Sequence, residues 1–222
     1  MNIQAVIFDR DNTLMHFDNA AGAAIEARIA AVAPTLPPGA VGRHWTAWPG
    51  PWPHAIDQEP AFWHVFWSQL AAQYQLPLDT IAALHEIGAF YHSCFIAFPD
   101  TLACLAALRA RGVRLAILTN FELPSIHLTL QNAGLDPSWF SVLLSSATTG
   151  FPKPDARAYL AAAAALGLAP AACAFVDDLV INVDAAQALG MNGWLLDRTG
   201  AAMASAPRHI RDLHQLISVL NI

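Results

Sequence analysis

Short apolar segments of strand length recur along this chain, and polar residues follow each of them. Four of these segments lie at residues 5–8, 113–118, 174–176 and 194–196. Between them, apolar residues recur at helical spacing and a glycine follows, as in residues 159–166 before Gly167. Strands that alternate with helices in this way form a parallel sheet with helices on both faces. We therefore expect an α/β fold whose core is a Rossmann-like, doubly wound parallel sheet.

Residues 15–98 have a different character. Seven of the 15 prolines fall within residues 34–60, and five of the seven tryptophans within residues 45–67. Helices are expected at residues 20–33, 61–74 and 80–95. No apolar alternation typical of a strand is convincing there. We expect an α-helical domain of residues 15–98, inserted after the first strand of an α/β core formed by residues 1–14 and 99–222.

The composition excludes several classes of protein. Hydrophobic residues make up 55% of the 222 residues and charged residues 13%, which predicts a buried core. A net charge of −6 without a basic run argues against a nucleic-acid polymer as partner. The long uncharged run of residues 158–176 contains Gly167 and Pro170, which favours a helix, loop and strand over a membrane span. The three cysteines lack metal-ligand spacing.

The first nine residues indicate a buried strand, because no basic residue precedes their short apolar run. A secretory signal peptide is therefore not expected. We expect a cytoplasmic protein, a monomer or a homodimer, that acts away from membranes.

Polar residues cluster where the expected strands end. Residues 9–13 read Asp-Arg-Asp-Asn-Thr, and the other clusters are Thr119 with Asn120, Lys153, and Asp177 with Asp178. An Asp in such a place also serves as a helix cap or turn residue, so the interpretation depends on the clusters occurring together. Active sites of open parallel sheets form at the carboxyl ends of the strands. We expect these side chains to meet there.

The residue types in these clusters suit phosphoryl chemistry. Asp9 and Asp11 are separated by one residue, so in extended backbone both point to the same side, and Asp178 can join them from a neighbouring strand. Clustered carboxylates repel one another unless a cation lies among them, and hard oxygen ligands favour Mg²⁺. Lys153 is the only lysine in the chain, beside ten arginines, which indicates a need for a compact ammonium. With a hydroxyl and an amide nearby, it suits a phosphoryl group.

In these motifs the chain resembles the haloacid dehalogenase superfamily of hydrolases, in its phosphatase-like branch with a C1 cap. The matching residues are 8–14 for the DxDxT motif, Thr119 and Asn120 for the second, Lys153 to Asp155 for the third, and Asp177, Asp178 and Asn182 for the fourth. The helical insertion lies where C1 caps lie in that family.

The resemblance implies a mechanism for the core residues. Asp9 is the expected nucleophile, which forms an aspartyl-phosphate. Asp11 is the expected acid and base, protonating the leaving oxygen and then deprotonating water. Mg²⁺ is expected on Asp9, the backbone carbonyl of Asp11, and Asp178. The expected phosphoryl ligands are Thr119, Asn120 and Lys153, and the supporting residues are Thr13, Asp177 and Asn182.

The leading hypothesis is thus a Mg²⁺-dependent hydrolase of phosphomonoesters, whose partner is a phosphorylated small molecule. A 2-haloacid dehalogenase is a second hypothesis, and Asp11 argues against it because halide leaves without a proton. A phosphomutase keeps both acids, and only the cap and the phosphoryl acceptor would separate it from a phosphatase. A binding protein on an inactive hydrolase fold would be expected to have lost a motif residue, and none is lost.

Other residues leave alternatives open. Asn12 stands where glycine is commoner, and it tolerates an unusual φ. Arg10 is interpreted either as a ligand of a substrate anion or as a solvated side chain. In the insertion, Arg43 is expected to bind a substrate carboxylate or phosphate. The tryptophans and phenylalanines of residues 45–67 form either a core for the insertion or a pocket for a ring.

Overall fold

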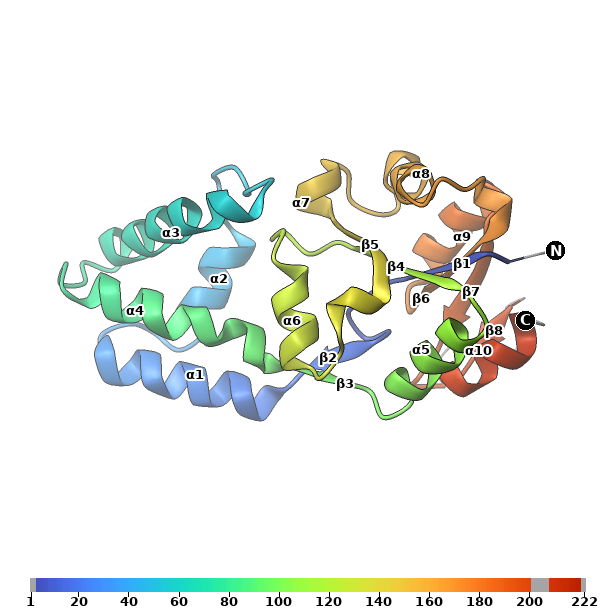
Figure 1. The fold of residues 1–222 in the computed structure, drawn as a ribbon. Helices are drawn as coiled ribbons and strands as arrows, with labels where there is room; N and C mark the ends of the chain where they lie inside the picture. Colours follow the sequence, from blue (N-terminus) through green and yellow to red (C-terminus); the bar gives the residue numbers. More distant parts are fainter. Residues whose placement is uncertain (1–2, 201–207, 221–222) are drawn as a thin grey trace.

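The structure, a computed structural model, describes residues 3–200 and 208–220 (Figure 1). Its core is a six-stranded sheet of parallel neighbours in the order β5-β4-β1-β6-β7-β8. The strands are β1 (Ala5–Phe8), β4 (Arg114–Thr119), β5 (Phe140–Ser145), β6 (Cys173–Asp177), β7 (Asn192–Leu196) and β8 (His209–Ile210). The predicted Rossmann-like α/β core is confirmed.

The central strand β1 shows how this sheet buries both of its faces. Val6 and Phe8 belong to one hydrophobic cluster and Ala5 and Ile7 to another, because successive side chains of a strand point to opposite faces. The first cluster includes residues of α5 (Thr101–Ala110), α6 (Ile126–Asn132) and α10 (Leu213–Leu220), and the second includes residues of α8 (Ala156–Ala165) and α9 (Val180–Ala188). A strand covered on both faces reads as an unbroken apolar run.

The helical insertion lies between β2 (Met15–Phe17) and β3 (Phe95–Ala97), which pair antiparallel in a separate two-stranded sheet. Its helices are α1 (Asn19–Val32), α2 (Ala40–Thr46), α3 (Glu59–Gln73) and α4 (Thr80–Gly88). Figure 1 shows them gathered at one end of the molecule, beyond α6. The expected division of the chain after residues 14 and 98 stays a prediction.

The insertion differs from the sequence-based expectation in two places. Residues 80–95, expected as one helix, form α4, then a 3₁₀ segment over Ala89–Cys94, and then the start of β3. No strand is expected from the sequence in this region, yet β2 and β3 are present, each three residues long. Three residues are too few to show alternation, and each strand finds its partner at the far end of the insertion.

Hydrogen bonds connect the insertion to two segments of the core. The backbone N–H of Ser125 donates to Oε1 of Glu59 in α3 at 2.8 Å. The Ser125 hydroxyl lies 3.2 Å from Nε2 of His92, which belongs to the 3₁₀ segment after α4. His54 Nδ1 donates to the carbonyl of Ala147 at 2.7 Å, in the short helix α7 (Ser146–Thr149). These contacts hold the insertion over the carboxyl edge of the sheet.

The packing of Trp67 on Gly88 yields a test of the insertion's core. Trp67 is 1% exposed, and a Cβ atom on Gly88 would lie 2.5 Å from its Cζ2 atom. We expect Gly88→Ala to lower the free energy of unfolding by about 1–3 kcal/mol, because the added Cβ would force the buried Trp67 ring out of its packed position. The control is Gly42→Ala in α2, where nothing lies within 4 Å; it should leave stability unchanged or raise it by up to about 1 kcal/mol. Denaturant unfolding measures both, and equal stability of Gly88→Ala and the parent would contradict this packing.

Candidate active site

The carboxyl ends of β4, β1 and β6 meet at one edge of the sheet, since β1 lies between the other two. A pocket of about 430 Å³ opens there. Its lining includes most of the side chains that the sequence singled out: Asp9, Asp11, Thr119, Asn120, Lys153, Asp177, Asp178 and Asn182. Residues far apart in the chain therefore share one site, as is usual at the carboxyl edge of a doubly wound sheet.

Lys153 lies at the centre of the charged groups. Its ammonium donates to Oδ1 of Asp9 at 2.5 Å and to Oδ2 of Asp177 at 2.7 Å. All three side chains are buried. Although burial disfavours its charge, the two carboxylates hold the pKa of Lys153 above its ordinary value. The ammonium thus stays charged and links the ends of β1 and β6.

Asn120 fixes the backbone that carries this lysine. Its Nδ2 donates to the Lys153 carbonyl at 2.8 Å, and its Oδ1 accepts from the Lys153 N–H at 2.7 Å. One Nδ2 hydrogen remains for a ligand. Thr119, which is also buried, accepts a hydrogen bond from the N–H of Phe121 at 3.3 Å. Its own hydroxyl hydrogen therefore remains available to the pocket.

The adjacent acids Asp177 and Asp178 differ in their surroundings. Asp177 is fully buried, and it accepts from Lys153, from Asn182 Nδ2 at 3.0 and 3.1 Å, and from the N–H of Leu179 at 2.9 Å. Asp178 is half-buried at the pocket. Burial, with the charge of Asp177, raises the pKa of Asp178. Asp177 is thus occupied with protein donors, whereas Asp178 faces the pocket.

The carboxylates fit a divalent cation. Oxygen atoms of Asp9, Asp177 and Asp178 all lie within 4.8 Å of one another. Lys153 supplies one positive charge against these three acids. Burial raises the pKa of Asp9 to about 7; Lys153 opposes that rise, while the charges of Asp177 and Asp11 add to it. An excess of buried negative charge on hard oxygen donors suits Mg²⁺.

The turn after β1 brings Asn12 and Thr13 close to this site. Asn12 adopts a φ of 56°, a left-handed conformation that Asn tolerates, as the sequence suggested. Asn12 lines the pocket together with Asp178. Thr13 is fully buried, and within the described residues its hydroxyl has no hydrogen-bond partner.

The structure contradicts one of the two interpretations of Arg10. Its side chain is not solvated, because it is 1% exposed, and it lines the pocket, so a role in binding a substrate anion stays a prediction. Its guanidinium donates to both carboxylate oxygens of Asp11 at 2.9 to 3.2 Å and to the Thr129 hydroxyl at 3.2 Å. It lies 3.9 Å from the ring centre of Phe121 and 4.6 Å from that of Phe95. Arg10 therefore orients Asp11, whose side chain is still 42% exposed.

The structure does not bring Arg43 to this site. Arg43 is exposed, donates to the carbonyl of Pro38 at 3.0 Å, and lines a separate depression with His44 and Tyr74. Arg43 does not line the pocket of Asp9, and the expectation that it binds a substrate anion stays a prediction.

Several pocket residues were not predicted. The insertion and its strands β2 and β3 contribute Phe17, Tyr91 and Phe95. Loops of the core contribute Glu122 and Leu179. Burial raises the pKa of Glu122. The position of Glu122, two residues after Asn120, is the one sequence signal that could have suggested a pocket residue.

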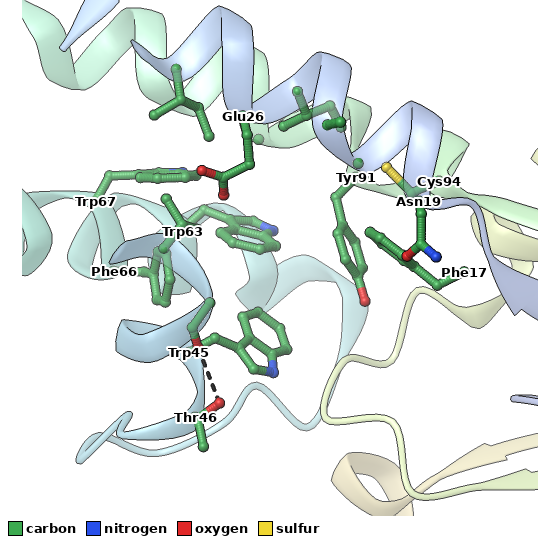
Figure 2. Close-up of a pocket in the computed structure, with 17 residues that line it drawn as sticks. Phe17, Asn19, Glu26, Trp45, Thr46, Trp63, Phe66, Trp67, Tyr91 and Cys94 are labelled. Atoms are coloured by element: carbon green, nitrogen blue, oxygen red, sulfur yellow. Dashed lines mark hydrogen bonds between the residues drawn. The ribbon is translucent and has the colours of Figure 1, made fainter. Parts of the chain in front are cut away.

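The aromatic residues within residues 45–67 form both a packed core of the insertion and part of the wall of a cavity. Trp48, Trp52 and Phe62 pack together, with ring centres 5.3 to 6.4 Å apart. Trp45 and Trp63 instead line a second cavity in the insertion (Figure 2).

The chain is similar in sequence to known hydrolases. Residues 3–190 match the haloacid dehalogenase-like hydrolase family. The Mycobacterium tuberculosis phosphatase MT3486 is 34% identical over 227 residues, which cover 100% of this chain and 98% of that protein. The Escherichia coli GMP/IMP nucleotidase YrfG is 33% identical over 160 residues, which cover 70% of this chain and 68% of that protein.

Solved structures agree on the fold. A 2-haloacid dehalogenase from Pseudomonas syringae has a TM-score of 0.74 to this structure, with 24% identity over 99% of this chain and 98% of that one. Within the part of the chain that the structure covers, no helix is both long and apolar enough to cross a membrane. The resemblance seen in the sequence motifs is confirmed, and this chain belongs to the haloacid dehalogenase-like hydrolases.

Proposed function

We propose that this chain is a Mg²⁺-dependent phosphatase of phosphorylated small molecules that acts through an aspartyl-phosphate on Asp9. The observation that carries the proposal is the Lys153 ammonium between the carboxylates of Asp9 and Asp177, with the acid Asp11 two residues after Asp9 at the same pocket. A full-length relative that is named a phosphatase supports it.

Asp9 is the nucleophile. One of its carboxylate oxygens attacks phosphorus, the bond from phosphorus to the leaving oxygen breaks, and Asp11 gives that oxygen its proton. In the second step Asp11 takes a proton from water as the water oxygen attacks phosphorus. Inorganic phosphate then leaves, and Asp9 regains its carboxylate. Arg10 holds Asp11 in place for both transfers.

The phosphoryl oxygens bind to the Lys153 ammonium, the Thr119 hydroxyl and the remaining amide hydrogen of Asn120. Asn120 also keeps Lys153 in position, since it bonds to both backbone groups of that residue. Preorganised donors of this kind stabilise charge without rearranging during the reaction.

Mg²⁺ would be held by Asp9, the backbone carbonyl of Asp11, and Asp178. When bound, it supplies positive charge that reduces repulsion between the Asp9 carboxylate and the phosphoryl oxygens. Asp177 and Asn182 support this site without binding the metal. The carboxylate oxygens of Asp177 accept hydrogen bonds from Lys153, Asn182 and Leu179. Thr13 supports the turn that carries Asp11.

The helical insertion acts as a cap that closes over the pocket and excludes water. The paired strands β2 and β3, at the two ends of the insertion, form its hinge. The contacts of Glu59 and His92 with Ser125, and of His54 with Ala147, hold it closed.

A dehalogenase is the alternative on the same fold. The Pseudomonas syringae structure is named a 2-haloacid dehalogenase. Asp11 favours a phosphatase, because an alkoxide leaving group needs a proton and a halide does not. A phosphomutase would use the same core residues and differ in the acceptor of the phosphoryl group.

Product analysis of the purified chain distinguishes these reactions. With Mg²⁺, we expect release of phosphate from p-nitrophenyl phosphate and no release of halide from 2-chloropropionate. A chelator should abolish phosphate release, and added Mg²⁺ should restore it. Halide release at a rate comparable to that of phosphate would overturn the assignment.

The two adjacent acids provide a test of the metal ligands. Asp178→Ala should raise the Mg²⁺ concentration required for half-maximal activity by roughly tenfold or more, a loss of about 1.4 kcal/mol. Asp177→Ala should change that concentration less and should lower the thermal midpoint of unfolding, because it leaves Asn182 without its buried partner and Lys153 with Asp9 alone. Mg²⁺ titrations and thermal unfolding of both variants measure this. The opposite order would mean that Asp177 is the metal ligand.

A further inference from the structure

Two arginines stack on phenylalanine rings where the helical insertion joins the core. The central carbon of the Arg10 guanidinium lies 4.6 Å from the ring centre of Phe95, and that of Arg198 lies 3.8 Å from the ring centre of Phe98. A cation at such a distance from an aromatic ring is attracted to it, most strongly where water is excluded. The two rings are close in the sequence, but the arginines they contact hold different groups.

The pair of Arg198 and Phe98 belongs to the core. The Arg198 guanidinium donates to both oxygens of Asp100 at 3.0 Å and to the carbonyl of Thr13 at 2.8 Å. The N–H of Phe98 donates to the carbonyl of Leu14 at 3.1 Å. These bonds fix the chain to the core just before β2 and just after β3. The segments that can move with the insertion therefore begin at these two strands.

The pair of Arg10 and Phe95 connects the core to those strands. Phe95 is the first residue of β3, is 5% exposed, and lies opposite Phe17 of β2 with ring centres 5.8 Å apart. Figure 1 shows β2 and β3 between the helices of the insertion and the main sheet. The other ring beside Arg10 belongs to Phe121, which follows β4. One ring at the guanidinium thus comes from the core, and the other comes from the strands of the insertion.

The carboxylate of Asp11 depends on Arg10 for its position. Among residues 3–200 and 208–220, the hydrogen bonds to its oxygens come from Nε and Nη2 of Arg10 alone. The third nitrogen of the guanidinium, Nη1, donates to the hydroxyl of Thr129 at 3.2 Å. Since the Asp11 side chain is 42% exposed, other protein groups cover little of it. A displacement of the guanidinium therefore displaces the proposed acid.

We propose that Phe95 is a positioning residue for proton transfer, and that it acts through Arg10 on Asp11. The inference rests on the proposed phosphatase activity. While β3 packs against the core, the Phe95 ring keeps the guanidinium, and with it the Asp11 carboxylate, at the pocket. When the insertion opens and β3 withdraws, this support is lost. The acid is thus held at the pocket only while the insertion is closed, and esters whose leaving group needs a proton depend on Phe95 most.

Two aryl phosphates that differ in leaving group provide the test. Phenolate is a more basic leaving group than p-nitrophenolate and gains more from the proton of Asp11. Phe95→Leu removes the aromatic face and keeps an apolar side chain. It should lower kcat/KM by roughly tenfold or more for phenyl phosphate and by less than about threefold for p-nitrophenyl phosphate, because a misplaced acid slows only the step that needs it. The value of kcat/KM reports on formation of the aspartyl-phosphate, so its later hydrolysis does not enter.

Two further variants control for a general effect on the fold. Phe95→Tyr keeps the ring and should keep the parent's ratio of the two kcat/KM values. Phe98→Leu is the matched control, because it removes a ring from Arg198 instead of Arg10, and it should also keep that ratio. An equal loss on both esters in Phe95→Leu, or an equally large change of the ratio in Phe98→Leu, would overturn the proposal.

Unfolding measures the same contact without catalysis. Arg10→Met and Phe95→Leu combined should lower the free energy of unfolding by less than the sum of the two single changes, because each single change already removes the contact between cation and ring. The losses of Arg10→Met and Phe98→Leu should add. Additive losses for Arg10→Met and Phe95→Leu would overturn the proposal. Failure of the parent to hydrolyse either ester would count against the phosphatase activity itself, while this cycle would still show whether Phe95 holds Arg10.

Discussion

The ammonium of Lys153 is the group on which the rest of the site depends. It lies 2.5 Å from Asp9 and 2.7 Å from Asp177, and all three are buried. Removing one partner from such a buried arrangement costs about 3–5 kcal/mol, because the charge that remains has no compensation. The single lysine of the chain thus joins the ends of β1 and β6 and fixes the carboxylate proposed as nucleophile. Asn120 and Asn182 complete this arrangement from either side.

A second charged pair connects the proposed acid to the rest of the molecule. Arg10 holds both oxygens of Asp11, and it lies between Phe121 of the core and Phe95 of β3. Because β3 is one of the two strands that lead into the insertion, the position of Asp11 is tied to the proposed hinge. The cavity in the insertion then adjoins the pocket through Phe17 and Tyr91. The pocket at the sheet edge and the cavity in the insertion are thus adjoining spaces.

The core and its motifs could be predicted from the sequence, because β1, β4 and β6 are apolar runs that end in polar residues. This pattern is local in the chain. The strands β2 and β3 could not be predicted, because each is three residues long and they pair across the whole insertion. The short helix α2 was also missed, since it lies in a region rich in proline. For Arg10 and Arg43 the sequence could show the charge but not the surroundings. Phe95 and Phe121 bury the first, and α2 turns the second toward solvent. Such outcomes depend on contacts between residues distant in the chain.

The central claim is that Asp9 carries the phosphoryl group during the reaction. Acid quenching of a single turnover with a ³²P-labelled phosphomonoester tests it directly, because an aspartyl-phosphate survives brief exposure to acid on the unfolded chain. We expect label on the protein within the turnover time, located by peptide analysis at Asp9 and absent from Asp9→Asn, which should keep the parent's fold by circular dichroism. Full phosphate release without labelled protein at any time point, or labelling of Asp9→Asn equal to that of the parent, would contradict the account.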